Sequence, residues 1–300
     1  MVIKKLNIAI IGAGKISSSL AGALEETGQH IEVIVSRNKS SARILADKYD
    51  IKKYSDRLSD IPESINFFII AAPDDAIFNI ASELSELPLQ FEKSHFIHLS
   101  GSRTSEELDP VKKRKAGTGS IHIMSTFPSK RRRKIAGSYA AVETESKSSE
   151  RLLYNFAREL GLIPFTISCE NKSFYHLAGV YASNFFTGQI YEAEKLLTGT
   201  LNDKNNALKI LLPIIKSTLA NIRNMGTAGA LSGPVERGDA ETVRKHLSSL
   251  KKKKDPLLLL NYASESLILL EVSEKKHGGL SATQIKIKDL LRSEIKKIRL

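Results

Sequence analysis

The sequence predicts an α/β domain with a mostly parallel, doubly wound sheet, followed by an all-α domain. Three observations support this fold class. Short β-branched apolar runs alternate with helical patterns up to about residue 168, as in βαβ units. A glycine-rich turn directly follows the first of these runs. After Cys169 only helical periodicity remains. At about 100–200 residues per domain, the 300 residues fit two domains.

The first strand covers residues 7–11, a β-branched run that ends at glycine. A helix over 15–27 follows, with Ile16, Leu20 and Leu24 on one face and Gly28 just beyond its end. The remaining predicted elements are a strand at 31–36, a helix at 39–48, strands at 66–72 and 95–100 with a helix at 75–86 between them, and strands near 119–124, 138–143 and 163–168. This alternation predicts parallel strands with helices on both faces.

The second half predicts helices over 171–198, 204–224, 239–250 and 255–273. Residues 281–300 carry apolar residues at helical spacing and follow a flexible break at His277, Gly278 and Gly279. We therefore divide the chain into a dinucleotide-binding domain at 1–168, an all-helical substrate and dimerisation domain at 169–274, and a basic amphipathic tail at 275–300.

Net charge is +12, and the lysines and arginines are concentrated in runs at 112–115, 130–134 and 251–254 and in the last fifteen residues. No aromatic residues interleave these runs, so we do not expect nucleic acid to be the partner. A basic face would also attract an anionic cofactor or substrate. The single cysteine, the lack of a signal peptide and the absence of any apolar stretch of about 20 residues predict a cytoplasmic protein without a membrane span.

The glycine-rich turn reads Gly12-Ala13-Gly14-Lys15-Ile16-Ser17, a G-x-G-x-x-S pattern between a strand and a helix. The first glycine permits the tight turn, and the second lets the backbone approach a pyrophosphate at the helix N-terminus. Ser17 takes the place of the third glycine. We predict that residues 12–16 bind a dinucleotide in a Rossmann-type domain.

The end of the second strand selects the cofactor. An NAD site has Asp or Glu there, whereas this chain has Ser36, Arg37, Asn38 and Lys39. Arg37 can pair with a 2′-phosphate, and Ser36 and Lys39 can add donors. The sequence thus predicts NADP(H), although Arg37 and Lys39 as plain exposed charges remain an alternative.

Two later strand ends fall at the same predicted edge of the sheet, where ligands bind in such folds. Ala72 and Pro73 follow one strand and should leave room for the cofactor. Ser100 and Gly101 follow the next strand and should border the nicotinamide, with Ser102 toward the substrate. The scattered histidines and lone cysteine give no reason to expect a metal site.

Six stretches together resemble a two-domain family with a Rossmann-like domain followed by a helical domain of unknown function. These stretches are GAGKISSSLA at 12–21, AAPDDAI at 71–77, HLSGS at 98–102, HIMSTF at 122–127, HLAGVYASNF at 176–185 and LSGPVERGD at 231–239. The family is related to ketopantoate reductase, pyrroline-5-carboxylate reductase and 6-phosphogluconate dehydrogenase. The resemblance covers roughly residues 5–270 and implies a second domain of the 6-phosphogluconate dehydrogenase C-terminal type. After His122 the chain departs from the family's Pro-Leu-Gln, which leaves the substrate open.

By analogy with ketopantoate reductases, the first helix of the helical domain would carry the catalytic residues. The resemblance implies His176 as proton donor and Asn184 as a substrate hydrogen-bond donor, with Lys172 as an alternative acid. Histidine suits a general acid, although His176 could instead be an ordinary buried histidine. His122 could contact substrate or nicotinamide, Ser183 could line the cleft, and Arg237 could bind a substrate carboxylate.

The resulting hypothesis is an NADP(H)-dependent reductase of a small, anionic carbonyl or imine compound, with a ketopantoate-like 2-oxo acid as the best named candidate. The resemblance also implies a homodimer formed through the helical domain. Two alternatives stay open: a cofactor-sensing protein without turnover, because fold alone does not imply activity, and a basic protein associated with nucleic acid.

Overall fold

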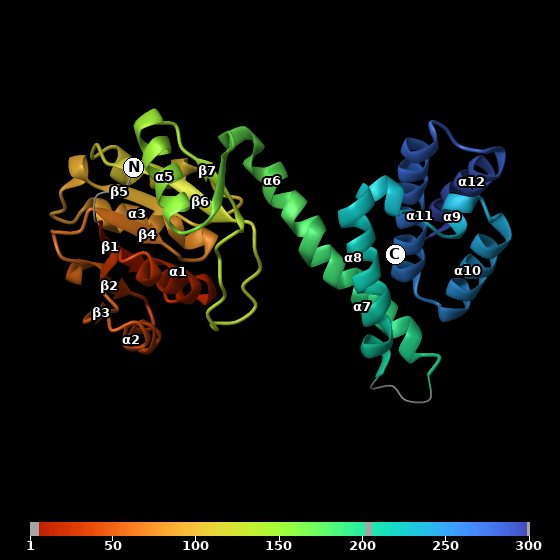
Figure 1. Ribbon diagram of the computed structural model, residues 1–300, viewed down its shortest axis with the longest axis horizontal. Helices are drawn as coiled ribbons and strands as arrows, with labels where there is room; N and C mark the ends of the chain where they lie inside the picture. The colour runs from red at the N-terminus through yellow and green to blue at the C-terminus, as the bar shows by residue number, and fades with distance from the viewer. Residues whose placement is uncertain (1–5, 202–205, 299–300) are drawn as a thin grey trace. The chain divides into compact units, whose positions relative to one another are not determined.

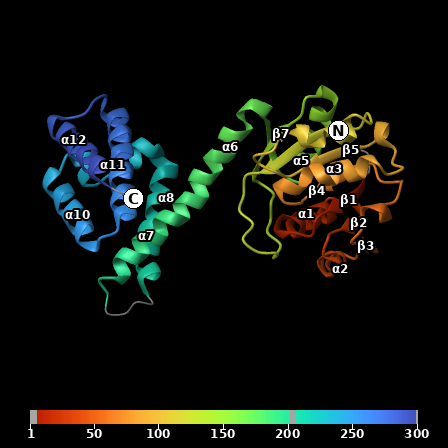
Figure 2. The same ribbon diagram turned by 180° about the vertical axis from the view of Figure 1, so that it is seen from behind.

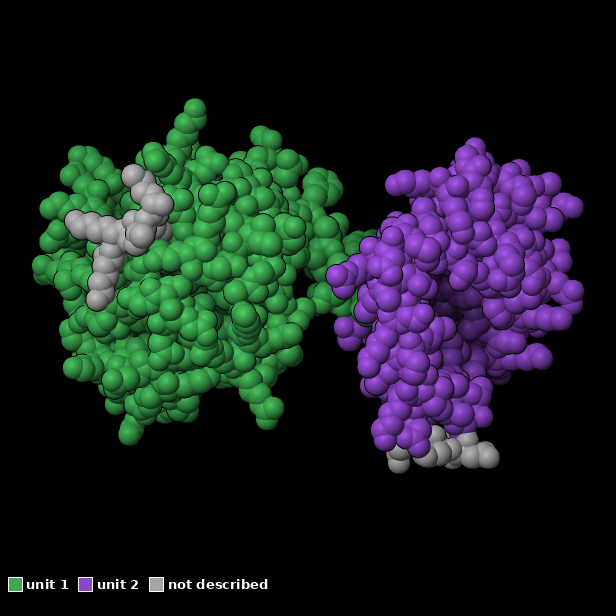
Figure 3. Space-filling model, viewed as in Figure 1, with its two compact units in different colours: residues 1–186 green, residues 187–300 purple. Residues whose placement is uncertain are grey.

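The computed structural model describes residues 6–201 and 206–298 and divides into two compact units, Met1–Phe186 and Thr187–Leu300 (Figures 1 and 3). The predicted helix at 204–224 thus begins outside the described residues, and the segment at 281–300 ends outside them. The division falls later in the chain than the predicted domain boundary at residue 168.

Within the described residues, eight strands form one sheet in the order β3-β2-β1-β4-β5-β6-β7-β8. The strands are β1 (Asn7–Ile11), β2 (His30–Val35), β3 (Lys53–Ser55), β4 (Phe67–Ile70), β5 (His95–His98), β6 (Gly117–Ile123), β7 (Tyr139–Glu143) and β8 (Ile163–Thr166). Neighbours pair in parallel except β6 with β7, which are antiparallel. The strand order reverses between β1 and β4, the switch point at which open α/β sheets bind ligands.

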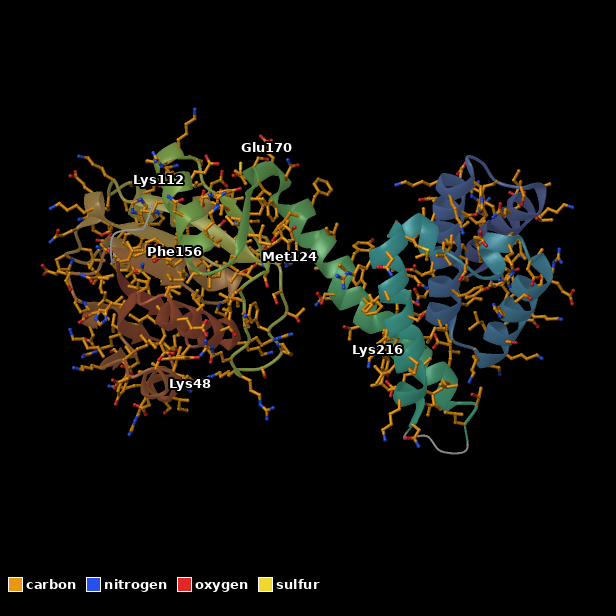
Figure 4. All side chains as sticks on the ribbon, viewed as in Figure 1. Lys48, Lys112, Met124, Phe156, Glu170 and Lys216 are labelled. Carbon is orange, nitrogen blue, oxygen red and sulfur yellow. The ribbon has the colours of Figure 1, made fainter. Side chains whose placement is uncertain are left out.

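Apolar residues on both faces of the sheet explain the layered arrangement, because successive strand residues point to opposite faces. Ile8 and Ile10 of β1 pack in one core with α1 (Lys15–Glu26), α2 (Lys39–Lys48) and α5 (Lys147–Glu159). Ala9 and Ile11 pack in a second core with α3 (Ile77–Ser85) and α4 (Asp109–Lys112). Phe156 of α5, labelled in Figure 4, packs its ring 4.6 Å from that of Phe67.

The predicted α/β class with a mostly parallel sheet and a following helical region is confirmed. Strand β3 and helices α4 and α5 are among the elements that were not predicted. Strand β3 has only three residues, and α5 connects β7 to β8. Helix α5 begins where Ser146 accepts a hydrogen bond from the Ser149 amide, and it buries Leu153 and Phe156.

The segment predicted as one helix over 171–198 is helical throughout but contains a π-helical stretch. It consists of α6 (Lys172–Gly179), the π-helix at Val180–Phe185 and α7 (Phe186–Thr198). π-Helices are rare, and they frequently occur at functional sites. The i→i+5 bonding of this stretch changes which side chains share a face with His176.

The second unit contains α8 (Ala207–Ala230), α9 (Pro234–Arg237), α10 (Ala240–Lys253), α11 (Pro256–His277) and α12 (Ala282–Lys297), as Figure 2 shows from behind. Helices α9, α10, α11 and α12 share one hydrophobic core, in which Val243, Leu247 and Leu270 are buried. Helix α11 ends at Gly278 in the left-handed conformation, where the flexible break was predicted. Beyond it, Ile287 and Leu291 of α12 are fully buried in the same core, so residues 282–297 of the predicted tail pack within this unit.

Candidate functional site in the first unit

The glycine turn after β1 has a geometry that only glycine tolerates at its first position. Gly12 has φ +112°, and a Cβ built on it would lie 2.3 Å from the carbonyl oxygen of Ala71. Ala71 directly follows β4, the strand next to β1. The turn therefore passes close to the switch point of the sheet, where only glycine fits. Helix α1 begins directly after the turn, at Lys15.

Ser17 stabilises this turn from the place of the usual third glycine. Its hydroxyl donates to the Gly12 carbonyl at 2.7 Å and accepts from the Gly14 amide at 3.2 Å. The residue is fully buried. With serine at position 17 in place of glycine, two hydrogen bonds from its side chain hold the turn at Gly12 and Gly14.

A cavity of about 470 Å³ opens at the carboxyl ends of β1, β2 and β4. Seven predicted cofactor residues line it: Gly12, Ala13, Gly14, Ser36, Arg37, Ala72 and Pro73. Lys15 is exposed and Ile16 packs against the core, and neither is among the lining residues. Lys39 is also outside the lining set and lies 3.9 Å from the carboxylate of Asp56.

A second cavity of about 290 Å³ lies between the end of β6 and the α6 segment of the same unit. It brings together four predicted residues: His122, His176, Ser183 and Asn184. Met124, labelled in Figure 4, forms part of its wall, and its sulfur would lie 3.2 Å from a Cβ on Gly179. His176 is half-buried, so it lines a cavity instead of filling a core.

Gly101 sits against both imidazoles. A Cβ at this position would lie 2.7 Å from Cδ2 of His176 and 2.9 Å from Nε2 of His122. The two rings are 6.1 Å apart, edge to face. The turn at Ser100 and Gly101, predicted to border the nicotinamide, therefore lies beside the two histidines and is not among the lining residues of the first cavity.

His122 is oriented by Tyr175, whose hydroxyl lies 2.8 Å from Nδ1. Burial, together with the nearby His176 and Lys172, lowers the pKa of His122 to about 4, so its ring is neutral at pH 7. Burial raises the pKa of Tyr175 to about 12, which keeps its hydroxyl protonated. The Tyr175 hydroxyl thus contacts Nδ1 of His122, and Nε2 of the same ring lies on the side of Gly101.

Lys172, the alternative acid, is buried in an ion pair. Its side chain is 1% exposed, lies 3.1 Å from the Glu143 carboxylate, and donates to the Ser120 hydroxyl. Burial lowers the pKa of Lys172 against the opposing effect of Glu143. Burial would raise the pKa of Glu143, but Lys172 and hydrogen bonds from Ser105 and Ser120 outweigh it and hold that pKa below its usual range.

Asp74 and Ser102 join two segments that lie next to the cavities in the chain. Ser102 donates to the Asp74 carboxylate at 2.6 Å, which ties the turn after β5 to the segment after Pro73 that lines the first cavity. His98, the last residue of β5, is fully buried. It accepts from the Ser100 amide on Nδ1 at 3.2 Å and lies 3.0 Å from the Thr104 carbonyl on Nε2, an arrangement that a neutral ring satisfies.

Arg237, the remaining predicted substrate residue, is exposed on α9 in the second unit. Across residues 6–201 and 206–298, no group of three or more His, Cys, Asp or Glu could hold a metal ion. In the same residues no helix is long and apolar enough to cross a bilayer.

Several residues of these cavities and of the contacts that support them were not predicted as site residues. Among them are Ser41, Asp74, Lys130, Glu143 and Tyr175. Tyr175 carried a weak signal, because it precedes His176 on the same helix. Lys130 lies in a basic run that the sequence marks as charged but does not place in space.

Two protein-family models match the chain. Residues 7–97 match the family described as NADP oxidoreductase, coenzyme F420-dependent, and residues 138–264 match a domain of unknown function, DUF2520. A search of curated proteins gives no match. The first match covers β1 to β5 and the glycine turn, and the second covers α6, the π-helix and most of the second unit.

Solved structures with a similar fold cover nearly the whole chain. BF3122 of Bacteroides fragilis, provisionally named an NADP oxidoreductase, is 24% identical with a TM-score of 0.71 over 91% of this chain and 98% of that one. Protein TM1727 of Thermotoga maritima is 26% identical, with a TM-score of 0.64 over 96% and 98%. The 1-pyrroline-5-carboxylate reductase of Streptococcus pyogenes is 16% identical, with a TM-score of 0.59 over 95% and 99%, and shares the fold.

The predicted resemblance is confirmed. The glycine turn, the cavity at the switch point and the helical second half all fit one architecture. The chain thus combines a segment similar to the NADP oxidoreductase family, at residues 7–97, with a segment similar to DUF2520, at residues 138–264.

Proposed function

We propose that this protein is an NADP(H)-dependent reductase of a small, anionic carbonyl or imine compound. The observation that carries the proposal is the pairing of two cavities in one unit. One is built on the glycine turn with Arg37 at its rim, and the other holds His122, His176 and Asn184. Ser102, which follows Gly101, donates a hydrogen bond to Asp74, which follows Pro73. The family's description as an NADP oxidoreductase supports the same cofactor.

The residues of the first cavity fit a dinucleotide. The space beside Gly12 would be closed by any Cβ, and Gly14 lies near it at the start of α1. Arg37 and Ser36 provide donors at the end of β2, where an NAD site has a carboxylate. We infer that Gly12 to Gly14 hold the pyrophosphate and that Arg37 binds the 2′-phosphate.

NADPH, when bound, supplies a hydride to the substrate carbon. The substrate oxygen or nitrogen then requires a proton or a hydrogen-bond donor. His122 is suited to a hydrogen bond with the substrate through Nε2, because Tyr175 contacts its Nδ1 and its low pKa keeps the ring uncharged. We assign proton transfer to His176 and substrate orientation to Asn184 and Ser183, which line the same cavity.

Lys172 is the weaker candidate for the acid in this proposal. Its ammonium is held by Glu143 and Ser120, and it is not among the residues that line the second cavity. We give it the role of positioning α6, because it lies one turn before His176 and fixes that helix to β6 and β7.

An anionic substrate is supported by a guanidinium near the second cavity. Arg133 donates to the carbonyl of Thr126 at 2.8 Å, and Thr126 lines the cavity. A 2-oxo acid such as ketopantoate carries both a reducible carbonyl and a carboxylate, and cyclic imines of the pyrroline type carry the equivalent pair. These two classes are our ordered candidates.

We also propose that the protein is a homodimer formed through its helical region. Helix α8 has 24 residues, of which Ala207 alone is buried among those described. Its exposed apolar side chains are Leu208, Ile210, Leu212, Ile214, Leu219, Ile222 and Met225. Exposed apolar surface of this extent marks an interaction site, and a two-fold contact is the commonest solution.

The test is NADPH oxidation by the full chain with a panel of 2-oxo acids and cyclic imines. We expect turnover with at least one carboxylate-bearing member and a lower rate when NADH replaces NADPH. Tight NADPH binding without turnover of any member would favour the sensing protein over the reductase. Failure to bind either nucleotide would refute the proposal.

A further inference from the structure

The loop between β6 and β7 carries five consecutive cations, Lys130 to Lys134, all of them exposed. Two of them attach the loop to α1. Arg132 donates to the Gly22 carbonyl at 3.3 Å and pairs with Glu26, and the Arg133 amide donates to the Ser19 hydroxyl at 2.9 Å. Ile135, at the end of the run, is buried in the sheet core. The basic loop is therefore held in place along α1.

This attachment directs Lys130 to the cofactor cavity. Its ammonium lies 3.1 Å from the hydroxyl of Ser41 in the first turn of α2. Lys130 and Ser41 both line the cavity, together with Ser36 and Arg37 from the end of β2. The rim thus has cations from two segments that are about ninety residues apart in the sequence.

Two cations and two carboxylates line this cavity. Arg37 and Lys130 line it, and the carboxylate of Asp56, which also lines it, has the ammonium of Lys39 at 3.9 Å. The other lining carboxylate, Glu83, comes from α3. One guanidinium neutralises only part of a phosphate dianion, and an ammonium is a compact point charge that serves as a second phosphate ligand.

We propose that Lys130 is a specificity-determining residue that closes a clamp around the 2′-phosphate of NADP(H), opposite Arg37 and beside Ser41. The proposal rests on the proposed cofactor and deepens it. It assigns to the basic loop a direct role in choosing NADP(H) over NAD(H), in place of a solvated surface run. Lys130 acts on cofactor binding alone and takes no part in the chemistry of the second cavity.

The test is calorimetric titration of the full chain with 2′,5′-ADP and with 5′-AMP, which differ only in the 2′-phosphate. Lys130→Ala should weaken 2′,5′-ADP binding about three- to tenfold, the range for a partly exposed charge-assisted contact, and leave 5′-AMP unchanged. Lys130→Arg should retain most of the affinity. Arg131→Ala is the matched control, because it removes the same charge from the next, exposed position and should change binding less than about twofold.

The outcomes separate this inference from the proposed function. If the wild-type chain binds 2′,5′-ADP better than 5′-AMP, and Lys130→Ala behaves like Arg131→Ala, the clamp is refuted while the NADP(H) assignment stands. Equal weakening of both ligands by Lys130→Ala would also refute it, since the residue would then support the cavity as a whole. A wild-type chain that binds the two ligands equally would overturn both the cofactor assignment and the clamp.

Discussion

The buried pair of Lys172 and Glu143 gives a prediction that also bears on catalysis. The Lys172→Met variant removes the cation that pairs with Glu143, whose side chain is 3% exposed. The Glu143 carboxylate is then buried without a counter-charge. Breaking a buried pair in this way costs about 3–5 kcal/mol. Glu143 keeps hydrogen bonds from the Ser105 amide, the Ser105 hydroxyl and the Ser120 hydroxyl, so we expect the lower end, about 3 kcal/mol.

Urea unfolding followed by circular dichroism measures this loss, with wild type and the exposed substitution Lys113→Met as references. Adding Glu143→Gln to Lys172→Met removes the unpaired charge while keeping an acceptor, and should recover more than half of the lost stability. A Lys172→Met variant within about 0.5 kcal/mol of wild type would refute the reasoning. Activity of the stabilised double variant then tests the alternative acid, because a proton-donating Lys172 predicts complete loss and a positioning Lys172 predicts a partial one.

Three further predictions concern the histidines and the assembly. His176→Ala should lower turnover by about 10²–10⁴ while NADPH affinity stays nearly unchanged; retention of more than about a third of the rate would reduce His176 to a packing role. Burial lowers the pKa of His98 and of His122 from an ordinary 6.5 to about 4, so the unfolded chain binds more protons between these values. Stability should therefore fall as pH drops from about 6.5 toward 4, by up to about 1.4 kcal/mol per pH unit for each histidine, and His98→Asn should flatten the dependence measured by urea unfolding. Light scattering should give twice the chain mass, and Ile214→Glu on the exposed face of α8 should give a monomer; a wild-type monomer at high concentration would contradict the dimer.

Much of the first unit was predictable because local patterns and global fold agree there. The apolar runs that form β1, β4 and β5 are buried on both sides of the sheet, and such runs are legible without knowing what covers them. The turn at Gly12 was equally legible, because its backbone conformation excludes other residues. Arg37 at the end of β2 followed from the same local rule.

The supporting contacts could not be predicted in the same way, because they join segments far apart in the chain. Lys172 meets Glu143 across 29 positions, and Tyr175 meets His122 across 53. No periodicity encodes such pairs. Lys39 was predicted as a phosphate ligand because it lies close to Arg37 in the sequence. In the structure Lys130, which is distant in sequence, lines the cofactor cavity, and Lys39 does not.

The sequence predicted that residues 171–198 are helical, but it did not predict the π-helix within them. The apolar and polar residues of this segment fit α-helical spacing, and nothing in their order marks the π-helix at Val180–Phe185. His176 and Asn184 nevertheless line one cavity, as their spacing led us to expect. Their chemical roles stay predictions until the substitutions are measured.

The central claim is that the first unit holds NADP(H) through the glycine turn and Arg37, and a nucleotide titration tests it most directly. Full-length wild type and Arg37→Ala should each be titrated with NADPH and NADH by calorimetry. We expect wild type to prefer NADPH. The loss of one charge-assisted phosphate contact is worth about 1.5–3 kcal/mol, so Arg37→Ala should weaken NADPH binding about tenfold to a hundredfold and change NADH binding little. Equal losses for both nucleotides, or a wild type that binds them alike, would contradict the account.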